Sequence, residues 1–287
     1  MSVVVITGAA GLIGSMLRPR LARPGRTLRL LDLVPLAAGP GEEAIQASVT
    51  DLEAMTAAPA EEVIRGSVTD LAAMTEACAG VSALIHLAGI SGEAPWDQIA
   101  AANIHGSYVA FEAARRAGVG RVVCASSNHA VGFTPRSEFP AADYAFPAPD
   151  TYYGVSKVTG EALASLYHHR YGMDTICIRI LTCAERPRNV RALSTWLSPD
   201  DAGRMFEACL TADRPGFRVI YGVSRNTRGG WASQKEAEAL GFVARDDAEA
   251  FAAEVIAAHG EPRTDDPVLA FLGGEFCLPD LDADRLG

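Results

Sequence analysis

Two side chains that could move a proton stand four residues apart in a segment with helical periodicity. Tyr153 begins the run YGVSK and Lys157 ends it. At this spacing of four residues the two side chains share one face of the helix expected over 152–171. An ammonium group beside a phenol favours the phenolate, which can accept a proton from an alcohol. Tyr152 has Ser156 at the same spacing and lacks such a partner. The pattern therefore predicts Tyr153 as a catalytic base assisted by Lys157.

A serine-rich segment could complete this site. The apolar run Arg121–Ser126 predicts a strand, and the polar segment Ser127–His129 follows it. Ligands bind at the carboxyl ends of strands in open α/β sheets, where the Ser127 hydroxyl could orient a reacting alcohol toward a base. The pair Ser127 and His129 does not indicate a serine hydrolase, because no nucleophile-elbow pattern surrounds the serine.

Three glycines near the N-terminus predict a turn that binds phosphate groups. Gly8, Gly11 and Gly14 stand in the run TGAAGLIG. A strand pattern, Val3–Thr7, precedes the helical pattern of Leu12–Leu21. The glycines permit a sharp turn, a close approach of the backbone to a pyrophosphate, and close packing of the helix on the strand. The N-terminus of the helix then faces the anion, so the segment predicts a dinucleotide cofactor.

An acidic residue at the end of the second strand pattern selects between two such cofactors. Asp32 ends the run Thr27–Asp32, eighteen residues past Gly14. A carboxylate at this point accepts hydrogen bonds from the adenosine ribose and repels a 2′-phosphate. The next residue is Leu33 rather than an arginine, so the sequence favours NAD over NADP.

Strand and helix patterns alternate along the chain, which predicts an α/β fold with a Rossmann-like, doubly wound parallel sheet. The strand candidates, rich in Val, Ile and Leu with little alternation, are Val3–Thr7, Thr27–Asp32, Glu62–Gly66, Ala83–Ala88, Arg121–Ser126, Thr175–Ile180 and Arg218–Val223. The helix candidates are Leu12–Leu21, Asp70–Cys78, Gln98–Ala117, Tyr152–Tyr171, Asp200–Ala212 and Asp246–His259. We expect one NAD-binding domain over 1–287, with a small C-terminal substrate-binding lobe mainly from 182–287. The last 28 or so residues are expected to wrap over the surface.

One internal repeat interrupts this rhythm. Residues 42–56 read EEAIQASVTDLEAMT and residues 61–75 read EEVIRGSVTDLAAMT, which match at eleven of fifteen positions. Two copies are too few for a solenoid and indicate a local tandem duplication. Because the second copy leads directly into the strand at 83–88, we assign the third strand and its helix to that copy. The first copy is then expected to be a surface insertion.

Composition narrows the classes of partner and site. The formal net charge of −10 provides no basic footprint for nucleic acid. No apolar run is long enough to span a membrane, and the N-terminus lacks the pattern of a signal peptide. The six cysteines are scattered without a C-x-x-C pair, which is typical of a cytoplasmic protein with reduced thiols. The sequence predicts no metal site.

Across about residues 1–185 the chain resembles the extended short-chain dehydrogenase/reductase superfamily. The residues that carry the resemblance are TGAAGLIG, Asp32, HLAG at 86–89, Asn103, ASSNH at 125–129 and YGVSK. Within that superfamily, the chain resembles the uronate dehydrogenases over nearly its whole length. The more specific matches are ASSNHAVGF, the segment 188–191, LSTWLSPDD at 193–201 and FLGGEF at 271–276.

The resemblance implies an activity and a set of contacts. The activity is oxidation of the C1 hydroxyl of galacturonate or glucuronate to the aldarolactone, with NAD taking the hydride. The implied sugar contacts are Ser91, Ser127, Asn128, His129, Tyr153, Thr182 and Arg191, with Arg191 gripping the carboxylate. The implied cofactor contacts are Gly8, Gly11, Leu12, Ile13, Gly14, Asp32, Ser67, Val68, Leu87, Ala88, Gly89, Tyr153 and Lys157. Superfamily members commonly pair through the helices expected at 98–117 and 152–171, which implies a homodimer or a higher homo-oligomer.

One departure and two alternatives remain at this point. The third strand of relatives usually ends in an aspartate that meets the adenine amine, whereas Ser67 stands here. A nucleotide-sugar epimerase or dehydratase of the same superfamily is one alternative, although only about 100 residues follow Ile180 to form its larger lobe. A catalytically silent NAD sensor is the other, and the presence of Ser127, Tyr153 and Lys157 argues against it. The sequence does not separate galacturonate from glucuronate.

Overall fold

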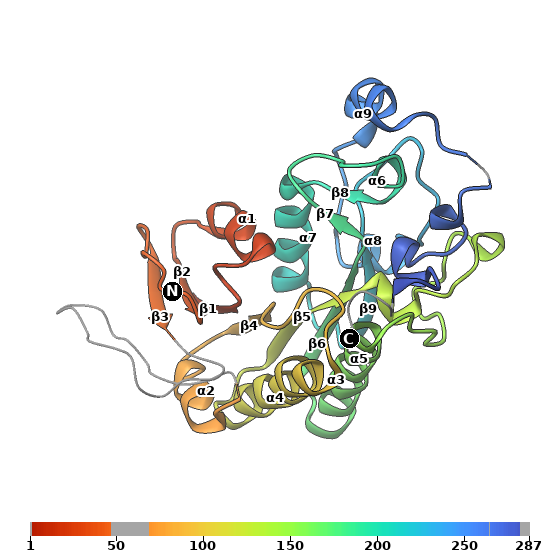
Figure 1. Cartoon of the computed structure of the whole chain (residues 1–287). Coiled ribbons are helices and arrows are strands. Elements are labelled where there is room, and N and C mark those ends of the chain that lie inside the picture. Colours follow the sequence, from red (N-terminus) through yellow and green to blue (C-terminus); the bar gives the residue numbers. More distant parts are fainter. Residues whose placement is uncertain (1, 47–68, 264, 282–287) are drawn as a thin grey trace.

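A parallel sheet forms the centre of the molecule. The computed structural model describes residues 2–46, 69–263 and 265–281 (Figure 1). Within these residues the main sheet has seven strands in the order β3-β2-β1-β4-β5-β6-β9, and every neighbouring pair is parallel. The strands are β1 (Ser2–Thr7), β2 (Arg26–Asp32), β3 (Glu42–Gln46), β4 (Ala83–His86), β5 (Arg121–Ser127), β6 (Asp174–Ile180) and β9 (Phe217–Gly222). The order reverses between β1 and β4, which places a ligand crevice at the carboxyl ends of these strands.

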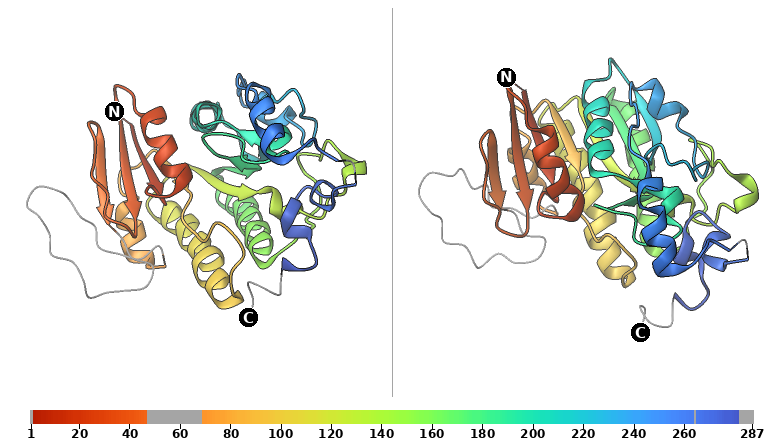
Figure 2. Two further views of the ribbon diagram at one scale, coloured as in Figure 1. Left: turned by 45° about the horizontal axis from the view of Figure 1, so that its top comes forward. Right: turned by 90° about the horizontal axis from the view of Figure 1, so that it is seen from above.

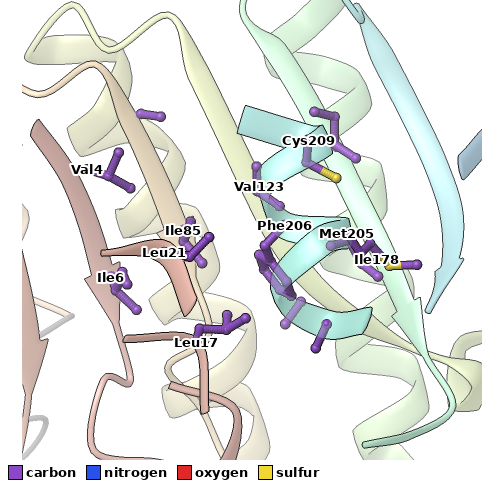
Figure 3. Packing of buried hydrophobic residues seen from close by; sticks show 14 of the residues in the cluster. Val4, Ile6, Leu17, Leu21, Ile85, Val123, Ile178, Met205, Phe206 and Cys209 are labelled. Carbon is purple, nitrogen blue, oxygen red and sulfur yellow. The ribbon is translucent and has the colours of Figure 1, made fainter. Parts of the chain in front are cut away.

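Helices cover both faces of the sheet, because the strands are apolar on both faces. Helices α1 (Leu12–Leu21) and α7 (Pro199–Thr211) cover one face, and α2 (Leu71–Ala77), α4 (Gly106–Arg116) and α5 (Tyr152–Tyr171) cover the other. Figure 3 shows Leu17 and Leu21 of α1 on the strand residues of the first face, beside Phe206 of α7. The doubly wound fold expected from the sequence is confirmed.

The shorter elements lie mainly in the second half of the chain. Helix α3 (Trp96–Ile99) runs through a π-helical turn, Ala100–His105, into α4, so the helix expected over 98–117 is continuous but locally widened. The other short elements are α6 (Ala192–Thr195), α8 (Lys235–Ala239), α9 (Ala252–His259) and a parallel pair formed by β7 (Thr182–Cys183) and β8 (Trp196–Leu197). Figure 2 shows the N-terminal strands and the C-terminal segments at opposite ends of the molecule.

The assignment of the third strand to the second copy of the repeat is wrong. Strand β3 comes from the first copy and pairs with β2 at the edge of the sheet. Glu42 of this copy binds Arg18 of α1 through two hydrogen bonds of 3.2 and 2.7 Å, and the bonds from Arg18 lower the pKa of Glu42. Residues 33–41 suffice to bring the first copy to the edge of the sheet, so the position of the second copy just before the strand at 83–88 did not indicate which copy forms the third strand. Helix α2 does come from the second copy, and the expected strand 62–66 lies outside the described residues.

The C-terminal segment does more than wrap over the surface. Leu269 and Leu272 are buried in a cluster with Tyr221 and Trp231. Leu272 is 0% exposed, so the expectation of a purely superficial tail is wrong for this stretch. In the part of the chain that the structure describes, no helix has the length and apolar character needed to cross a membrane.

Candidate active site

A cavity of about 1200 Å³ opens at the carboxyl ends of the central strands. It runs from the turn after β1 and the end of β2, past the segment after β4, to the end of β5 and the start of α5. The predicted site residues in its wall are Gly8, Gly11, Leu12, Ile13, Gly14, Asp32, Leu87, Ala88, Gly89, Ser91, Ser127, His129, Tyr153 and Lys157. The structure therefore brings most of the predicted cofactor and catalytic residues into one space.

The glycine turn leaves an open cradle at one end of this cavity. Gly8 has a φ of +72°, and a Cβ there would lie 2.8 Å from the backbone nitrogen of Ala88. A Cβ at Gly14 would collide with the carbonyl oxygen of Gly8. Helix α1 begins at Leu12, and its N-cap residue Gly11 offers no side-chain cap, so the amides of the first turn remain available to an anion. The cradle fits the pyrophosphate of a dinucleotide.

The carboxylate of Asp32 is held at the rim of this cradle. Its Oδ2 accepts a hydrogen bond of 2.8 Å from the amide of Ala10, and its Oδ1 accepts one of 3.0 Å from the amide of Val34. A carboxylate has about four acceptor sites, so two backbone bonds leave capacity for ribose hydroxyls. The position agrees with the sequence-based expectation for an NAD-selecting residue.

Ser127, Tyr153 and Lys157 come together at the middle of the cavity. Lys157 Nζ lies 5.2 Å from the centre of the Tyr153 ring and donates a 3.0 Å hydrogen bond to the carbonyl of Ala125. Ser127 ends β5, and its hydroxyl accepts a hydrogen bond from the amide of His129 and contacts the side chain of Asn128. The His129 ring lies edge-on to Tyr153, with 5.7 Å between the ring centres. This arrangement can place a hydroxyl group against a phenol and a serine.

Two residues outside the predicted set fix the start of α5. The carboxylate of Glu93 accepts hydrogen bonds from the amides of Tyr152 and Tyr153, at 3.2 and 2.8 Å. Thr151 caps the helix by accepting a 3.0 Å bond from the amide of Gly154. Both interactions hold Tyr153 in place from outside the YGVSK run. Glu93 is 60 residues from Tyr153 in sequence, so no local pattern indicated its role.

A buried ion pair supports the catalytic residues from beneath. Glu161, one helical turn beyond Lys157, accepts two 2.8 Å hydrogen bonds from Arg179 of β6 and one of 2.6 Å from Ser126. Burial opposes the charge of Arg179, but the bonds to Glu161 raise its pKa above the usual value. Through Arg179, Glu161 joins α5 to β6, and through Ser126 it joins α5 to β5, one residue before Ser127.

Behind the cavity wall, next to Thr182, Arg191 is buried without an ion-pair partner among the described residues. Arg191 donates to the hydroxyl of Thr182 at 3.3 Å and to the carbonyl of Leu272, and its Nε has no partner. Its guanidinium lies 5.5 Å from the centre of the Trp231 ring. Burial lowers the pKa of Arg191 to about 10. Among the described residues no carboxylate forms an ion pair with it, and the charges of Glu275 and Asp150 oppose the lowering of its pKa only in part.

Not every predicted residue lies in the cavity wall. Asn128 and Thr182 are next in sequence to lining residues, whereas Arg191 reaches the cavity only through its contact with Thr182. The side-chain amide of Asn128 donates a 2.9 Å hydrogen bond to the carbonyl of Leu272. Ser67 and Val68 lie outside the described residues.

Lining residues that the sequence did not single out include Thr69, Ile90, Asp97, Gln98, Ala101, Ala102, His105, Ile180, Leu181 and Cys183. A helical pattern at 98–117 was visible, but the side of that helix facing a ligand depends on the packed structure. In residues 2–46, 69–263 and 265–281, no three His, Cys, Asp or Glu side chains are grouped as a metal site would need.

Comparison with known proteins places this geometry in a family. Residues 4–188 match the NAD dependent epimerase/dehydratase family. The uronate dehydrogenase of Pseudomonas putida is 40% identical over 277 residues, which are 96% of this chain and 95% of that protein. The crystal structure of uronate dehydrogenase from Agrobacterium tumefaciens superposes with a TM-score of 0.84 at 38% identity, covering 96% of this chain and 97% of that one. Glucuronic acid dehydrogenase from Chromohalobacter salexigens gives a TM-score of 0.85 at 36% identity, covering 96% of each chain.

Proposed function

We propose that this chain, which belongs to the NAD dependent epimerase/dehydratase family and within it to the uronate dehydrogenases, oxidises a hexuronate at C1. The substrate is D-galacturonate or D-glucuronate in its pyranose form, and the product is the aldarolactone. The observation that carries this proposal is Arg191, a buried guanidinium without a carboxylate partner among the described residues. A carboxylate on the substrate would supply the missing charge through two parallel hydrogen bonds.

The cradle at the end of β1 suits NAD. The turn at Gly8, Gly11 and Gly14 would hold the pyrophosphate, and Asp32 would accept hydrogen bonds from the adenosine ribose. The same carboxylate would repel a 2′-phosphate, which favours NAD over NADP. Leu12, Ile13, Leu87, Ala88 and Gly89 would line the rest of the cofactor site.

Three residues would serve the proton transfer, each in a different role. When bound in the cavity, NAD would supply the acceptor for the hydride of C1 of the sugar. Tyr153, as the phenolate, takes the proton of the C1 hydroxyl, so the C1–O bond becomes a carbonyl and the sugar becomes a lactone. The ammonium of Lys157 stabilises the phenolate, and the Ser127 hydroxyl orients the reacting oxygen. Ser91, Asn128, His129 and Thr182 would complete the contacts to the sugar.

Three further proposals concern the substrate lobe, the oligomeric state and the cellular compartment. Residues 182–287 would contribute most of a small substrate lobe to one NAD-binding domain. The exposed apolar side chains of Tyr108, Leu166 and Tyr171, which are 40, 48 and 46% exposed on α4 and α5, support a homodimer through these helices. Light scattering tests this point, and a monomer would contradict it. The six free cysteines support a cytoplasmic enzyme.

The direct test is reduction of NAD by candidate sugars. Purified protein is mixed with NAD and D-galacturonate or D-glucuronate, and NADH absorbance is followed, with D-galactose, D-glucose and UDP-glucose as controls. We expect rapid reduction with a uronate and little with neutral sugars. NAD binding without reduction by either uronate would contradict the proposed substrate. In that case, turnover of UDP-glucose would favour an epimerase or dehydratase, and no turnover at all would favour an NAD sensor.

A further inference from the structure

A buried carboxylate lies directly behind the histidine of the cavity wall. Asp150 has a side chain that is 0% exposed, and its Oδ2 lies 2.7 Å from His129 Nδ1. Its Oδ1 accepts a 2.9 Å hydrogen bond from the hydroxyl of Thr151. Among the described residues, His129 is its one ion-pair partner. The thiol of Cys277 donates a longer hydrogen bond, of 3.8 Å, to the same Oδ2.

Three glycines from separate segments leave room for this carboxylate. A Cβ at Gly132 or at Gly273 would collide with Asp150 Oδ2, and one at Gly154 would lie 3.1 Å from Oδ1. Any larger residue at the first two positions would displace the carboxylate from His129. The N-terminal end of α5, which begins two residues after Asp150, favours a negative charge there. Packing and the helix dipole therefore both accommodate an ionised Asp150.

Two aromatic contacts, in addition to the bond to Asp150, fix the orientation of the His129 ring. It stacks on Phe276 with 4.1 Å between ring centres and lies edge-on to Tyr153. An ionised carboxylate can only accept hydrogen bonds, so the proton of a neutral His129 must be on Nδ1. Nε2 is then a free acceptor on a ring that lines the cavity, and no described residue donates a hydrogen bond to it. A sugar hydroxyl is the matching donor.

We propose that Asp150 is a positioning residue for substrate oxidation: it holds His129 in the tautomer whose Nε2 accepts a hydrogen bond from a sugar hydroxyl near Tyr153. This inference rests on the proposed function, because the ligand is taken to be a polyhydroxylated sugar. Asp150 does not touch the substrate; it acts through His129. The arrangement has the logic of the carboxylate that orients the histidine in a serine-protease triad, applied here to binding rather than to nucleophile activation.

The test is the isosteric change Asp150→Asn. The hydroxyl of Thr151 accepts a bond from Gly154 and donates its own proton to Asp150 Oδ1, so it would retain the amide oxygen at the Oδ1 position. The amide NH₂ then faces Nδ1 of His129 and forces the ring proton onto Nε2. We expect kcat/KM for the uronate to fall about 10²–10³-fold, with the Kd for NAD within twofold of wild type.

A spectroscopic measurement separates positioning from general destabilisation. Nitrogen-15 NMR of the histidine rings should report protonation of His129 at Nδ1 in the wild type and at Nε2 in Asp150→Asn. The matched control is Asp143→Asn, because Asp143 is also buried and bonded to a hydroxyl, that of Ser233, but lies outside the cavity wall. The control should leave both the tautomer of His129 and kcat/KM unchanged.

A double-mutant cycle completes the test. His129→Phe keeps an aromatic ring against Phe276 but removes both nitrogens. If Asp150 acts through His129, adding Asp150→Asn to His129→Phe should reduce kcat/KM less than about threefold further. The proposal would be overturned if Asp150→Asn lowered kcat/KM as much in His129→Phe as in the wild type. It would also be overturned if the His129 tautomer were unchanged in Asp150→Asn. If wild-type protein oxidises no uronate, the proposed function fails, and the tautomer measurement still decides the role of Asp150.

Discussion

The two ends of the cavity are built in different ways. At the cofactor end, the important contacts join residues of one turn or of neighbouring strands, such as the Ala10 amide and Asp32. At the sugar end, side chains from distant segments meet on the C-terminal stretch: Asn128 and Arg191 both donate to the carbonyl of Leu272, across 144 and 81 residues. Figure 2 shows how far these C-terminal segments lie from the N-terminal strands.

The difference indicates which part of the molecule determines specificity. A compact glycine turn with one carboxylate can hold the same dinucleotide in many proteins. The sugar end depends on how the chain after β6 folds back over β5, so its chemistry can change without changing the cofactor site. The Tyr153 region lies between the two and serves both.

The largest expected effect separates chemistry from cofactor binding at this junction. Tyr153→Phe removes the proton acceptor and keeps the ring that packs near Lys157 and His129. We expect kcat to fall by at least about 10³-fold, because no other group takes the proton of the C1 hydroxyl. The Kd for NAD, measured by calorimetry, should stay within about twofold. Retained turnover would mean that the base has been misassigned.

A second change tests whether the buried ion pair between Glu161 and Arg179 stabilises the fold beside the cavity. Glu161→Gln leaves the buried Arg179 without its counter-charge, and we expect the free energy of unfolding to fall by about 3–5 kcal/mol. Urea denaturation measures this loss. Arg263→Ala serves as the control, because it breaks an exposed ion pair with Asp265 and should produce no measurable change. Equal effects of the two changes would show that the Glu161–Arg179 pair does not hold α5 to the sheet.

Asp32→Ala tests whether cofactor preference depends on the cofactor end of the cavity alone. Loss of the carboxylate removes both the ribose acceptor and the repulsion of a 2′-phosphate. We expect the ratio of kcat/KM with NAD to that with NADP to fall about 10–100-fold. The uronate KM at saturating cofactor should change little, because Asp32 is at the other end of the cavity. An unchanged cofactor ratio would contradict the assignment.

The smallest expected effect concerns a histidine under the glycine turn. His86 lies between the hydroxyls of Thr7 and Ser107, and burial and the charge of Lys157 lower its pKa to about 3. Between pH 6.5 and 5.5 the unfolded chain therefore binds a proton that folded His86 does not, so the free energy of unfolding falls as pH falls. We expect about 1 kcal/mol from this group. His86→Gln should lose that part of the pH dependence in urea denaturation, and an identical dependence in both proteins would contradict it.

The same contrast explains what could be predicted from the sequence. Helices α1 and α5, the glycine turn, Asp32 and the Tyr153–Lys157 pair carry their signal in spacings of a few residues. The structure has both helices with the predicted bounds and places the glycine turn, Asp32, Tyr153 and Lys157 around one cavity. The repeat concealed the origin of β3, because the two copies are nearly identical in sequence. Glu93 and Asp150 could not be found, since their roles arise only when residues up to 60 and 127 positions away pack against them.

The measurement that tests the account most directly is kcat/KM for D-galacturonate in the wild type and in Arg191→Met. Methionine preserves much of the side-chain volume beside Trp231 but removes the buried charge. The account predicts a loss of about 10²–10³-fold in kcat/KM, with the Kd for NAD unchanged. Wild-type kcat/KM in Arg191→Met would show that this arginine does not bind the substrate carboxylate and would contradict the central claim.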